Sequence, residues 1–322
     1  MVDFEHKMNE LGSRKIPFLF ILDFDLENPV VIPLAEINNS EILYDVNGKS
    51  NVKTDTVHSS GKPFRKVIPV KKEVYCKAFK KIQEGISHGD SFLTNLTMPA
   101  KVETDLSLKD IFKISRAKYK LYFKDLFVVF SPEPFIRTEN RIIRSFPMKG
   151  TMDASLPEAE VRLLNSVKEL AEHYTIVDLI RNDLNMVAEK VKVSRFRYVE
   201  KIKTHYGELL QMSSEITGEL PENHHGSLGT ILKKLLPAGS VSGAPKQKTV
   251  GMIHHAEPYK RGYYTGVFGI FDGENIDSGV MIRYIEKSDD GFVYKSGGGI
   301  TANSDCEEEY EEIIRKIYVP TA

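Results

Sequence analysis

Hydrophobic and polar positions follow two kinds of period along this chain, and each kind predicts a different element. Residues 17–33, PFLFILDFDLENPVVIP, hold two apolar runs around an Asp/Glu/Asn segment, which predicts two strands joined by a turn. From Lys72 to about Ser87 apolar residues recur at roughly one-face helical spacing, which predicts a helix. Residues 89–102 then predict a strand, and residues 106–120 predict a second helix.

The middle of the chain combines a ribbon of short strands with a long helical stretch. Residues 125–151 contain an apolar run, a break, and two short segments around a Glu-Asn turn, which predicts a β-ribbon. Residues 161–191 predict one long helix. Within it Leu170, Tyr174 and Val177 recur at four- and three-residue steps, as expected of a packed face.

The remaining elements complete the prediction of the fold class. Polar residues 40–66 predict an exposed loop or an edge hairpin. Later elements are strands near 192–219 and 263–299, helices near 226–236, from Pro245 and over 306–319, and a Gly/Ser loop at 239–243. Strands are spread along the chain with helices between them, but without strict βαβα alternation. This arrangement favours an α+β fold of mostly antiparallel sheets flanked by helices.

Composition and charge narrow the class of protein. The 322 residues carry a formal net charge of -1, which gives no electrostatic footprint for nucleic acid. No run of about 18 apolar residues occurs, so we expect no transmembrane helix, and the start of the chain lacks the apolar core of a secretory signal. Cys76 and Cys306 are far apart and lack metal-type spacing. We therefore expect a soluble, cytoplasmic protein.

Two predicted helices carry the same arrangement of acidic residues, Glu169 with Glu172 and Glu309 with Glu312. Residues three apart lie on one helix face, where like charges destabilise each other by a few tenths of a kcal/mol unless a cation lies between them. If the two helices converge, the four carboxylates form a site for a hard cation, most naturally Mg²⁺. The alternative is that both pairs are ordinary solvated helix faces.

Two glycine-containing segments and an arginine have the chemistry of an anion site. GSVSGAPKQKTV (239–250) leads into a helix near Pro245, and backbone N–H groups at such a start bind anions. SGGGI (296–300) lets a ligand approach the backbone closely, and Arg283 adds a bidentate partner for a carboxylate. Each segment is alternatively a simple turn. Together with the acidic pairs, they indicate a small substrate with more than one carboxylate.

Seven segments between about Lys72 and the end of the chain carry a family resemblance through their order. They are SPEPF (131–135), FPMKGT (146–151), KELAEHYTIVDLIRNDL (168–184), GSVSGAPK (239–246), RGYYTGVFG (261–269), IRYIE (282–286) and GGGITANSDCEEEYEE (297–312). The set resembles the chorismate-utilising enzymes, a family that includes anthranilate, aminodeoxychorismate, isochorismate and salicylate synthases.

This resemblance implies two large, mostly antiparallel β-sheets packed as a sandwich with flanking helices. It implies one chorismate-binding catalytic domain over residues 1–322, in which residues 1–70 are a shortened N-terminal strand region. It also implies a Mg²⁺ cofactor held by Glu172 and Glu312, with Glu169 and Glu309 in support. The residues it implies for substrate binding are Thr151, Ser242, Gly243, Ala244, Lys246, Tyr264, Arg283, Gly297, Gly298 and Gly299.

Position 149 bears most on the choice among the family members. By itself, Lys149 is either a solvated turn lysine or a nucleophile held in a pocket. In this position it resembles the aminodeoxychorismate synthases, which implies that Lys149 adds to C2 of chorismate while Glu133 protonates the departing C4 hydroxyl. Leu93 stands where water-adding members use a lysine base. Gln211 stands where many members place a His, so we expect the product to keep its enolpyruvyl group.

The implied product is 4-amino-4-deoxychorismate, formed with ammonia and used for 4-aminobenzoate and folate. A separate glutamine amidotransferase partner is implied, because neither Cys76 nor Cys306 lies in the turn expected of a glutaminase nucleophile. Two alternatives stay open. The chain is alternatively the large subunit of an anthranilate synthase, or a non-catalytic subunit that binds an amidotransferase.

Overall fold

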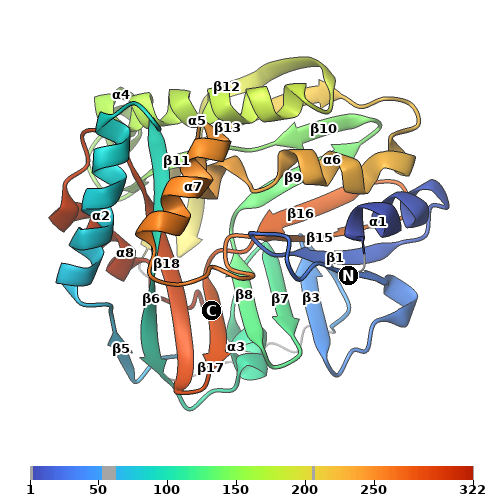
Figure 1. The fold of residues 1–322 in the computed structure, drawn as a ribbon, viewed down its shortest axis with the longest axis horizontal. Coiled ribbons are helices and arrows are strands. Elements are labelled where there is room, and N and C mark those ends of the chain that lie inside the picture. Colours follow the sequence, from blue (N-terminus) through green and yellow to red (C-terminus); the bar gives the residue numbers. More distant parts are fainter. Residues whose placement is uncertain (1–2, 53–62, 205–206, 322) are drawn as a thin grey trace.

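Two large β-sheets with helices outside them form the protein (Figure 1). The computed structural model describes residues 3–52, 63–204 and 207–321. The strand pairs of both sheets in these ranges are antiparallel, which confirms the predicted α+β fold class. No helix of the described ranges is long and apolar enough to cross a membrane.

The first sheet contains three strands of the predicted ribbon, β9 to β11, together with strands from distant parts of the chain. Its described strands are β1 (Phe18–Leu22), β2 (Val30–Pro33), β9 (Pro134–Glu139), β10 (Ile142–Ser145), β11 (Met148–Asp153), β12 (Glu189–Thr204), β13 (Gly207–Glu219), β15 (Val267–Phe271) and β16 (Ile276–Val280). Their order is β11, β13, β10, β9, β16, β15, β1, β2, and β12 pairs with β13. The strand pair predicted within residues 17–33 is confirmed.

The second sheet packs against the first, and its strand β6 pairs with three others, β5, β14 and β18. Its described strands are β3 (Ile42–Val46), β4 (Lys49–Ser50), β5 (Lys66–Ile68), β6 (Leu93–Glu103), β7 (Tyr119–Phe123), β8 (Phe127–Ser131), β14 (Gly243–Ala244), β17 (Tyr284–Ser288) and β18 (Gly291–Ile300). Their order is β14, β6, β18, β17, β8, β7, β3, β4, and β5 pairs with β6. The ribbon predicted over residues 125–151 is confirmed, with β8 in this sheet and β9 to β11 in the other.

An apolar layer joins the two sheets. Leu19 and Ile21 of β1 lie in this layer with side chains of β3, β7, β8, β15 and β17. Phe18, Phe20 and Leu22 point the other way, into the core beneath the helices. A strand buried on both faces reads as a continuous apolar run, which is the pattern of β1.

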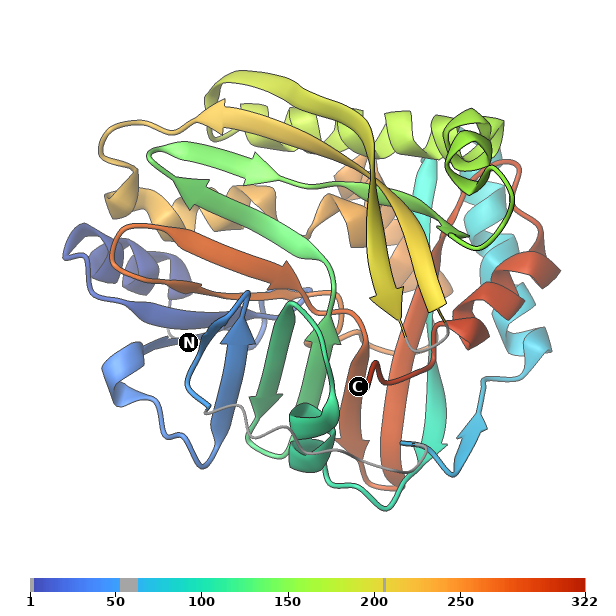
Figure 2. The same cartoon turned by 180° about the vertical axis from the view of Figure 1, so that it is seen from behind.

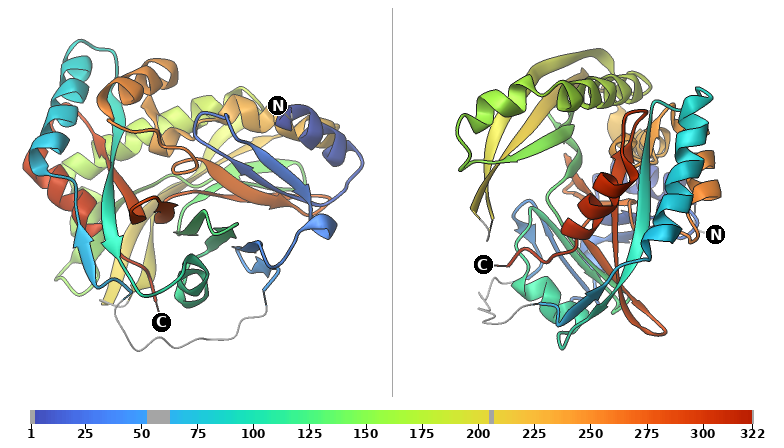
Figure 3. Two further views of the ribbon diagram at one scale, coloured as in Figure 1. Left: turned by 60° about the horizontal axis from the view of Figure 1, so that its bottom comes forward. Right: turned by 90° about the vertical axis from the view of Figure 1, so that its left-hand side faces the viewer.

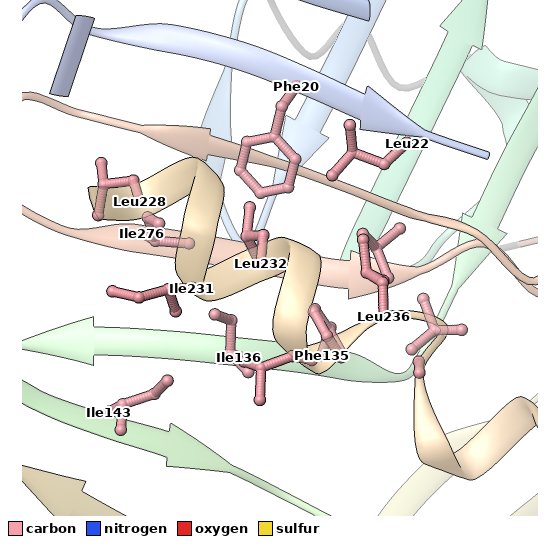
Figure 4. Packing of buried hydrophobic residues seen from close by; sticks show 14 of the residues in the cluster. Phe20, Leu22, Phe135, Ile136, Ile143, Leu228, Ile231, Leu232, Leu236 and Ile276 are labelled. Atoms are coloured by element: carbon pink, nitrogen blue, oxygen red, sulfur yellow. The ribbon is translucent and has the colours of Figure 1, made fainter. Parts of the chain in front are cut away.

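Helices cover the outer faces of both sheets. On the first sheet lie α1 (Phe4–Ser13), α4 (Ala159–Asn165), α5 (Val167–Asn185) and α6 (Leu228–Leu235), and on the second lie α2 (Lys72–Ser87), α3 (Leu108–Ile114) and α8 (Cys306–Arg315). α7 (Lys246–Ala256) packs against α2 and β6. Figure 4 shows α6 over the first sheet, where Leu228 and Leu232 pack with Phe20, Ile136 and Ile276.

A disulfide between Cys76 and Cys306 ties α2 to α8. The two Cα atoms are 6.0 Å apart although the residues are separated by 230 positions in the sequence. α2 and α8 lie side by side (Figure 3), and α8 in turn packs on β18 (Figure 2). Cys306 opens α8, three residues before Glu309. The position of this acidic helix is therefore fixed covalently as well as by packing.

Two predicted helices are shorter in the structure. The helix predicted over residues 106–120 ends at Ile114, since Ser115 is extended and the chain continues into β7. The long helix predicted over residues 161–191 is wrong, because it is divided into α4 and α5. Ser166 separates them, and its side chain accepts a hydrogen bond from the backbone N–H of Glu169. A helix cap thus interrupts an apolar period that runs through it.

Further differences concern burial. Tyr174, predicted on the packed face of its helix, is 56% exposed. The segment predicted as an exposed loop or edge hairpin forms the hairpin of β3 and β4, but Ile42 and Val46 are buried because β3 also pairs with β7. Residues 53–62 of that segment lie outside the described residues. Helix α1 was not predicted from the sequence.

We expect reduction of the Cys76–Cys306 bond to lower the stability of the protein. The bond closes a loop of 230 residues, and a native disulfide typically contributes about 2–4 kcal/mol by restricting the unfolded chain. The melting temperature should therefore fall by roughly 3–6 °C in dithiothreitol. The control is the double variant Cys76→Ser/Cys306→Ser. Its melting temperature should equal that of the reduced wild type, with or without reductant. Equal melting temperatures after complete reduction of the wild type would contradict this expectation.

Candidate active site

Two helices present the acidic pairs that the sequence analysis singled out. α5 starts at the Ser166 cap and carries Glu169 and Glu172, and α8 carries Glu309 and Glu312. Asp305 caps α8 by accepting hydrogen bonds from two backbone N–H groups of its first turn. Glu172 and Glu309 are buried, with 9% and 3% of their surface exposed. Buried carboxylates are uncommon unless hydrogen-bonded or paired. One member of each pair is therefore enclosed by the protein, whereas the side chain of Glu312 is 42% exposed.

Two glycines lie directly against these carboxylates. A Cβ atom on Gly298 of β18 would lie 3.3 Å from Oε2 of Glu309 and 3.7 Å from Oε1 of Glu312. Gly150 of β11 has a φ of +84°, and a Cβ atom there would lie 2.9 Å from Oε2 of Glu169. The missing side chains leave the carboxylate oxygens close to the strands. Gly150 also needs its left-handed backbone, which favours glycine.

Lys316, just after α8, is a cation beside this cluster. Its Nζ lies 2.6 Å from Oε1 of Glu312 and donates a hydrogen bond of 3.0 Å to the carbonyl oxygen of Gly297. The sequence analysis missed Lys316, although its spacing of four residues from Glu312 is the helical spacing of ion pairs. Lys316 therefore links the acidic face of α8 to residues 297–299 of β18, the glycine segment of this strand.

The structure does not gather the four predicted metal ligands into one closed cage. Among the described residues, no three His, Cys, Asp or Glu side chains form a group suited to a metal. Glu309 and Glu312 come together at Gly298, while Glu169 lies at Gly150. This arrangement is compatible with a Mg²⁺ ion, because Mg²⁺ is usually bound by one or two carboxylates together with water and substrate oxygens.

The glycine segment of β18 has one open edge. The pairing of β17 with β18 ends at Tyr284 and Lys295, whereas the pairing of β6 with β18 continues to Ile300. In the described part of the chain, no strand pairs with residues 296–300 on the edge away from β6. This edge leaves room for the ligand contact predicted for residues 297–299, which stays a prediction.

Arg283 lies at the same edge, immediately before β17. Its Nε is buried and has no hydrogen-bond partner, and its guanidinium lies 5.0 Å from the ring centre of Tyr318. Its φ of +53° is rare for a residue other than glycine and is often found at functional sites. A buried donor without a partner is unfavourable, and a bound carboxylate would satisfy it.

Tyr264 is a second hydrogen-bonding group near Arg283. It is buried, and its ring centre lies 5.7 Å from that of Tyr284, the residue after Arg283. Burial raises the pKa of the Tyr264 phenol, so the hydroxyl keeps its proton at neutral pH and can donate to an anion. The structure thus brings together Arg283, Tyr264 and the glycine segment.

Glu133 is held by a serine that the sequence analysis did not single out. Oγ of Ser240 donates a hydrogen bond of 2.5 Å to Oε1 of Glu133. The backbone of Glu133 is fixed on both sides, because its N–H donates to Oγ of Ser131 and its carbonyl accepts from the N–H of Val280. These contacts orient the carboxyl group. No local sequence signal marks Ser240, since it lies 107 residues away.

The residues of the loop at 242–246 form hydrogen bonds and an ion pair with other parts of the protein. The hydroxyl of Ser242 donates to the carbonyl oxygen of Ala238, and Gly243 and Ala244 pair with β6. A Cβ atom on Gly243 would lie 1.9 Å from the carbonyl oxygen of Leu93, so only glycine fits there. Nζ of Lys246 lies 2.8 Å from Oδ2 of Asp183. In this structure Lys246 therefore links α7 to α5.

Lys149 and Thr151 belong to β11, but their side chains lie outside the described residues. The register of β11 with β13 shifts between Met148 and Thr151, so a bulge surrounds Lys149. Pro147, two residues before Lys149, accepts a hydrogen bond at its carbonyl oxygen from the backbone N–H of Ser214. Oγ of Ser214 lies 2.7 Å from Nε2 of the buried His173 on α5. His173, which the sequence analysis missed, thus helps to connect the Lys149 segment to the helix with Glu172.

A buried ion pair connects the segments that carry these groups. Arg261 forms two hydrogen bonds to Glu257, from Nε at 2.9 Å and from Nη2 at 2.6 Å. It also donates to the carbonyl oxygens of Val241 and Asn95, at 2.7 and 2.6 Å. Glu257 accepts from the backbone N–H and the hydroxyl of Thr97. The pair therefore joins β6, the loop before β14 and the segment that leads to Tyr264.

The chain matches a known family over most of its length. Residues 33–322 match the family described as chorismate binding enzyme. The chain belongs to this family. The acidic helices, the glycine edge of β18 and Arg283 all lie within the matched range.

Curated relatives include proteins with different names. An uncharacterised PabA-like protein of Pasteurella multocida is 51% identical over 318 residues, covering 98% of both chains. Anthranilate synthase component 1 of Acetivibrio thermocellus and aminodeoxychorismate synthase component 1 of Escherichia coli are each 33% identical over 263 residues. These matches cover 77% and 76% of this chain, but only 52% and 56% of the relatives. The chain thus aligns with about half the length of these two proteins.

Among solved structures, the fold is similar to that of MenF, the menaquinone-specific isochorismate synthase from Escherichia coli. The TM-score is 0.74 with 16% sequence identity, and the alignment covers 97% of this chain and 79% of the other. This likeness supports the two-sheet fold.

We expect the variant Glu257→Gln to be strongly destabilised. Removing one partner leaves the Arg261 charge buried without compensation, which should lower the free energy of unfolding by about 3–5 kcal/mol. The matched control is Glu27→Gln, which removes the partner of the exposed Lys260 and should change stability by less than about 1 kcal/mol. Chemical denaturation of both variants measures the difference. A similar, small effect of both substitutions would show that the buried pair is not an essential link.

Proposed function

We propose that this protein aminates chorismate at C4 to give 4-amino-4-deoxychorismate. The observation that carries the proposal is a lysine at position 149, in β11, within a chain of the chorismate-binding family. The similarity to aminodeoxychorismate synthase component 1 of Escherichia coli supports it. The two protein groups that the reaction needs are then Lys149 as nucleophile and Glu133 as acid.

Substrate binding would use the open edge of β18. One carboxylate of chorismate would accept hydrogen bonds from Arg283, from the hydroxyl of Tyr264 and from backbone N–H groups of residues 297–299. The buried, unpartnered Nε of Arg283 supports this assignment. Thr151 and the loop at 242–246 would line the border of the same site. The second carboxylate would lie toward the acidic helices.

Mg²⁺ is the cofactor that these acidic helices suit. Glu172 and Glu312 would hold the ion, with Glu169 and Glu309 supporting them directly or through water. When bound, the ion supplies positive charge that neutralises a substrate carboxylate. Burial of Glu172 and Glu309, and the space left by Gly298 beside Glu309 and Glu312, support this donor set.

The reaction would proceed in two displacements. Nζ of Lys149, in its neutral form, adds to C2 of chorismate, the ring double bonds shift, and the C4 hydroxyl leaves as water with a proton from Glu133. Ammonia then adds at C4, the double bonds return, and the nitrogen of Lys149 leaves C2. The hydrogen bond from Ser240 would hold Glu133 in position for both displacements.

The biological setting follows from this chemistry. Ammonia would come from a separate glutamine amidotransferase partner, since the two cysteines of this chain form a disulfide and cannot serve as glutaminase nucleophiles. The product would be used for 4-aminobenzoate and folate, in the cytoplasm.

Anthranilate synthesis is a second candidate, because the chain is equally identical to an anthranilate synthase component 1. Lys149 and Gln211 disfavour it, since Gln211 cannot act as the proton-transferring His. A water-adding reaction is disfavoured by Leu93, an apolar, buried residue of β6. A non-catalytic subunit would have no chemical reason to keep Glu133, Lys149 and Arg283 together.

The decisive test is product analysis. The purified protein, incubated with chorismate, Mg²⁺ and ammonium at mildly alkaline pH, should form 4-amino-4-deoxychorismate, detected by chromatography and mass spectrometry. Anthranilate or isochorismate as the product would replace the proposal by one of the alternatives. Chorismate binding without turnover, also in the presence of a glutaminase subunit, would leave the non-catalytic role.

We expect Lys149→Ala to reduce amination by roughly 100-fold or more, as removal of a covalent nucleophile does. Chorismate affinity should remain close to that of the wild type, because Arg283 and the glycine edge are unchanged. Steady-state kinetics with ammonium and calorimetric titration with chorismate measure the two effects. The control is Lys192→Ala, on an exposed part of β12, which should behave like the wild type. A Lys149→Ala rate close to the wild-type rate would eliminate the covalent mechanism.

A further inference from the structure

The segment that follows α8 is tied to the second sheet. It crosses β18 toward β17 (Figure 2), and the hydroxyl of Tyr294 on β18 donates a hydrogen bond of 3.1 Å to the carbonyl oxygen of Tyr318. Val319 is buried in the apolar cluster between α3 and this sheet. The carbonyl oxygen of Pro320 accepts a backbone hydrogen bond from the loop before β7. The segment is therefore held in a fixed position relative to β17 and β18.

Within this segment, the side chain of Tyr318 contacts the guanidinium of Arg283. The centre of the guanidinium lies 5.0 Å from the centre of the Tyr318 ring, a distance at which a cation is attracted to an aromatic face. The phenol oxygen also accepts a hydrogen bond from the guanidinium. Neither contact uses the buried Nε–H of Arg283, which has no hydrogen-bond partner among the described residues. Tyr318 thus restrains the guanidinium and leaves one of its donors for a ligand.

We infer that Tyr318 is a positioning residue for the carboxylate of the substrate and acts through Arg283. The inference rests on the carboxylate contact proposed above for Arg283, and it adds the side chain that orients this contact. A guanidinium binds a carboxylate best through two parallel N–H groups, so its plane has to be aligned with the ligand. An arginine side chain free to rotate loses this alignment in most of its conformations, whereas the Tyr318 contact keeps the plane in one orientation before the ligand binds.

The burial of Tyr318 separates this role from that of a core side chain. Tyr318 is half-buried, whereas Tyr294, which also lies near Arg283, is fully buried in the apolar cluster. The segment around Tyr318 is held through its backbone carbonyls and through Val319, not through the Tyr318 ring. Loss of the ring should therefore leave the fold intact and change the binding of the substrate.

The first test removes the ring and measures the affinity for chorismate by calorimetric titration. Tyr318→Leu should raise the Kd by roughly tenfold, whereas Tyr318→Phe keeps the ring and should raise it by no more than about threefold. The matched control is Tyr122→Leu. Tyr122 lies in the same apolar cluster as Val319 and also has a cation beside its ring, Nζ of Lys109 at 5.9 Å, but it is on β7, two strands from β17. This control should lower the melting temperature and leave the Kd unchanged.

The second test asks whether Tyr318 acts through Arg283. In the Arg283→Lys background the charge stays but there is no planar group to align, so Tyr318→Leu should then raise the Kd for chorismate by no more than about threefold. Such a double-mutant cycle separates the pair from a general disturbance of the segment, which would weaken binding equally in both backgrounds. An equal loss in both backgrounds, an equal effect of Tyr318→Phe and Tyr318→Leu, or an unchanged Kd for Tyr318→Leu would each overturn the inference.

The outcome for Tyr318 can be told apart from the outcome for the proposed function, because chorismate binding is measured without ammonium. A wild type that binds chorismate but forms anthranilate refutes the amination and leaves the role of Tyr318 in place. A wild type that does not bind chorismate refutes the carboxylate contact of Arg283, and the inference with it.

Discussion

The ion pair of Arg261 and Glu257 holds several segments of the candidate site in one arrangement. Its charges are almost fully buried, so they are stable only with each other and with the carbonyl and hydroxyl groups around them. Those groups come from β6 and from the loop before β14, and Arg261 itself begins the segment that carries Tyr264. Misplacing any one of these segments would leave a buried charge unsatisfied, so the pair enforces their common position.

The site is assembled from segments that are distant in sequence but adjacent in the two sheets. The edge of β18 at residues 297–299 is open because the pairing with β17 ends at Tyr284. Arg283 lies at that edge because it immediately precedes β17. On the other side, α8 is fixed to α2 by the disulfide and to β18 by Lys316. Rigid neighbours of this kind are what a preorganised binding site requires.

Sequence reasoning succeeded where the signal is local. The bounds of α2 follow from a helical period that lasts several turns, and the ribbon of β8 to β11 follows from its turns. One local signal was missed, since the Ser166 cap, bonded to the N–H of Glu169, divides a continuous apolar period. Other failures lie where tertiary contacts decide. Helix α1 depends on its packing against α6, and a partner such as Ser240 arises from long-range packing that no single segment encodes.

β1 has a consequence for the way this family is delimited. The family match begins at residue 33, but β1 precedes it and lies between β15 and β2 in the first sheet. Its side chains enter two cores, on opposite faces of the sheet. A protein trimmed to the matched region would lose both contributions and expose β15 as an edge that can pair with other chains. The limit of the family match is therefore not the limit of the cooperative folding unit.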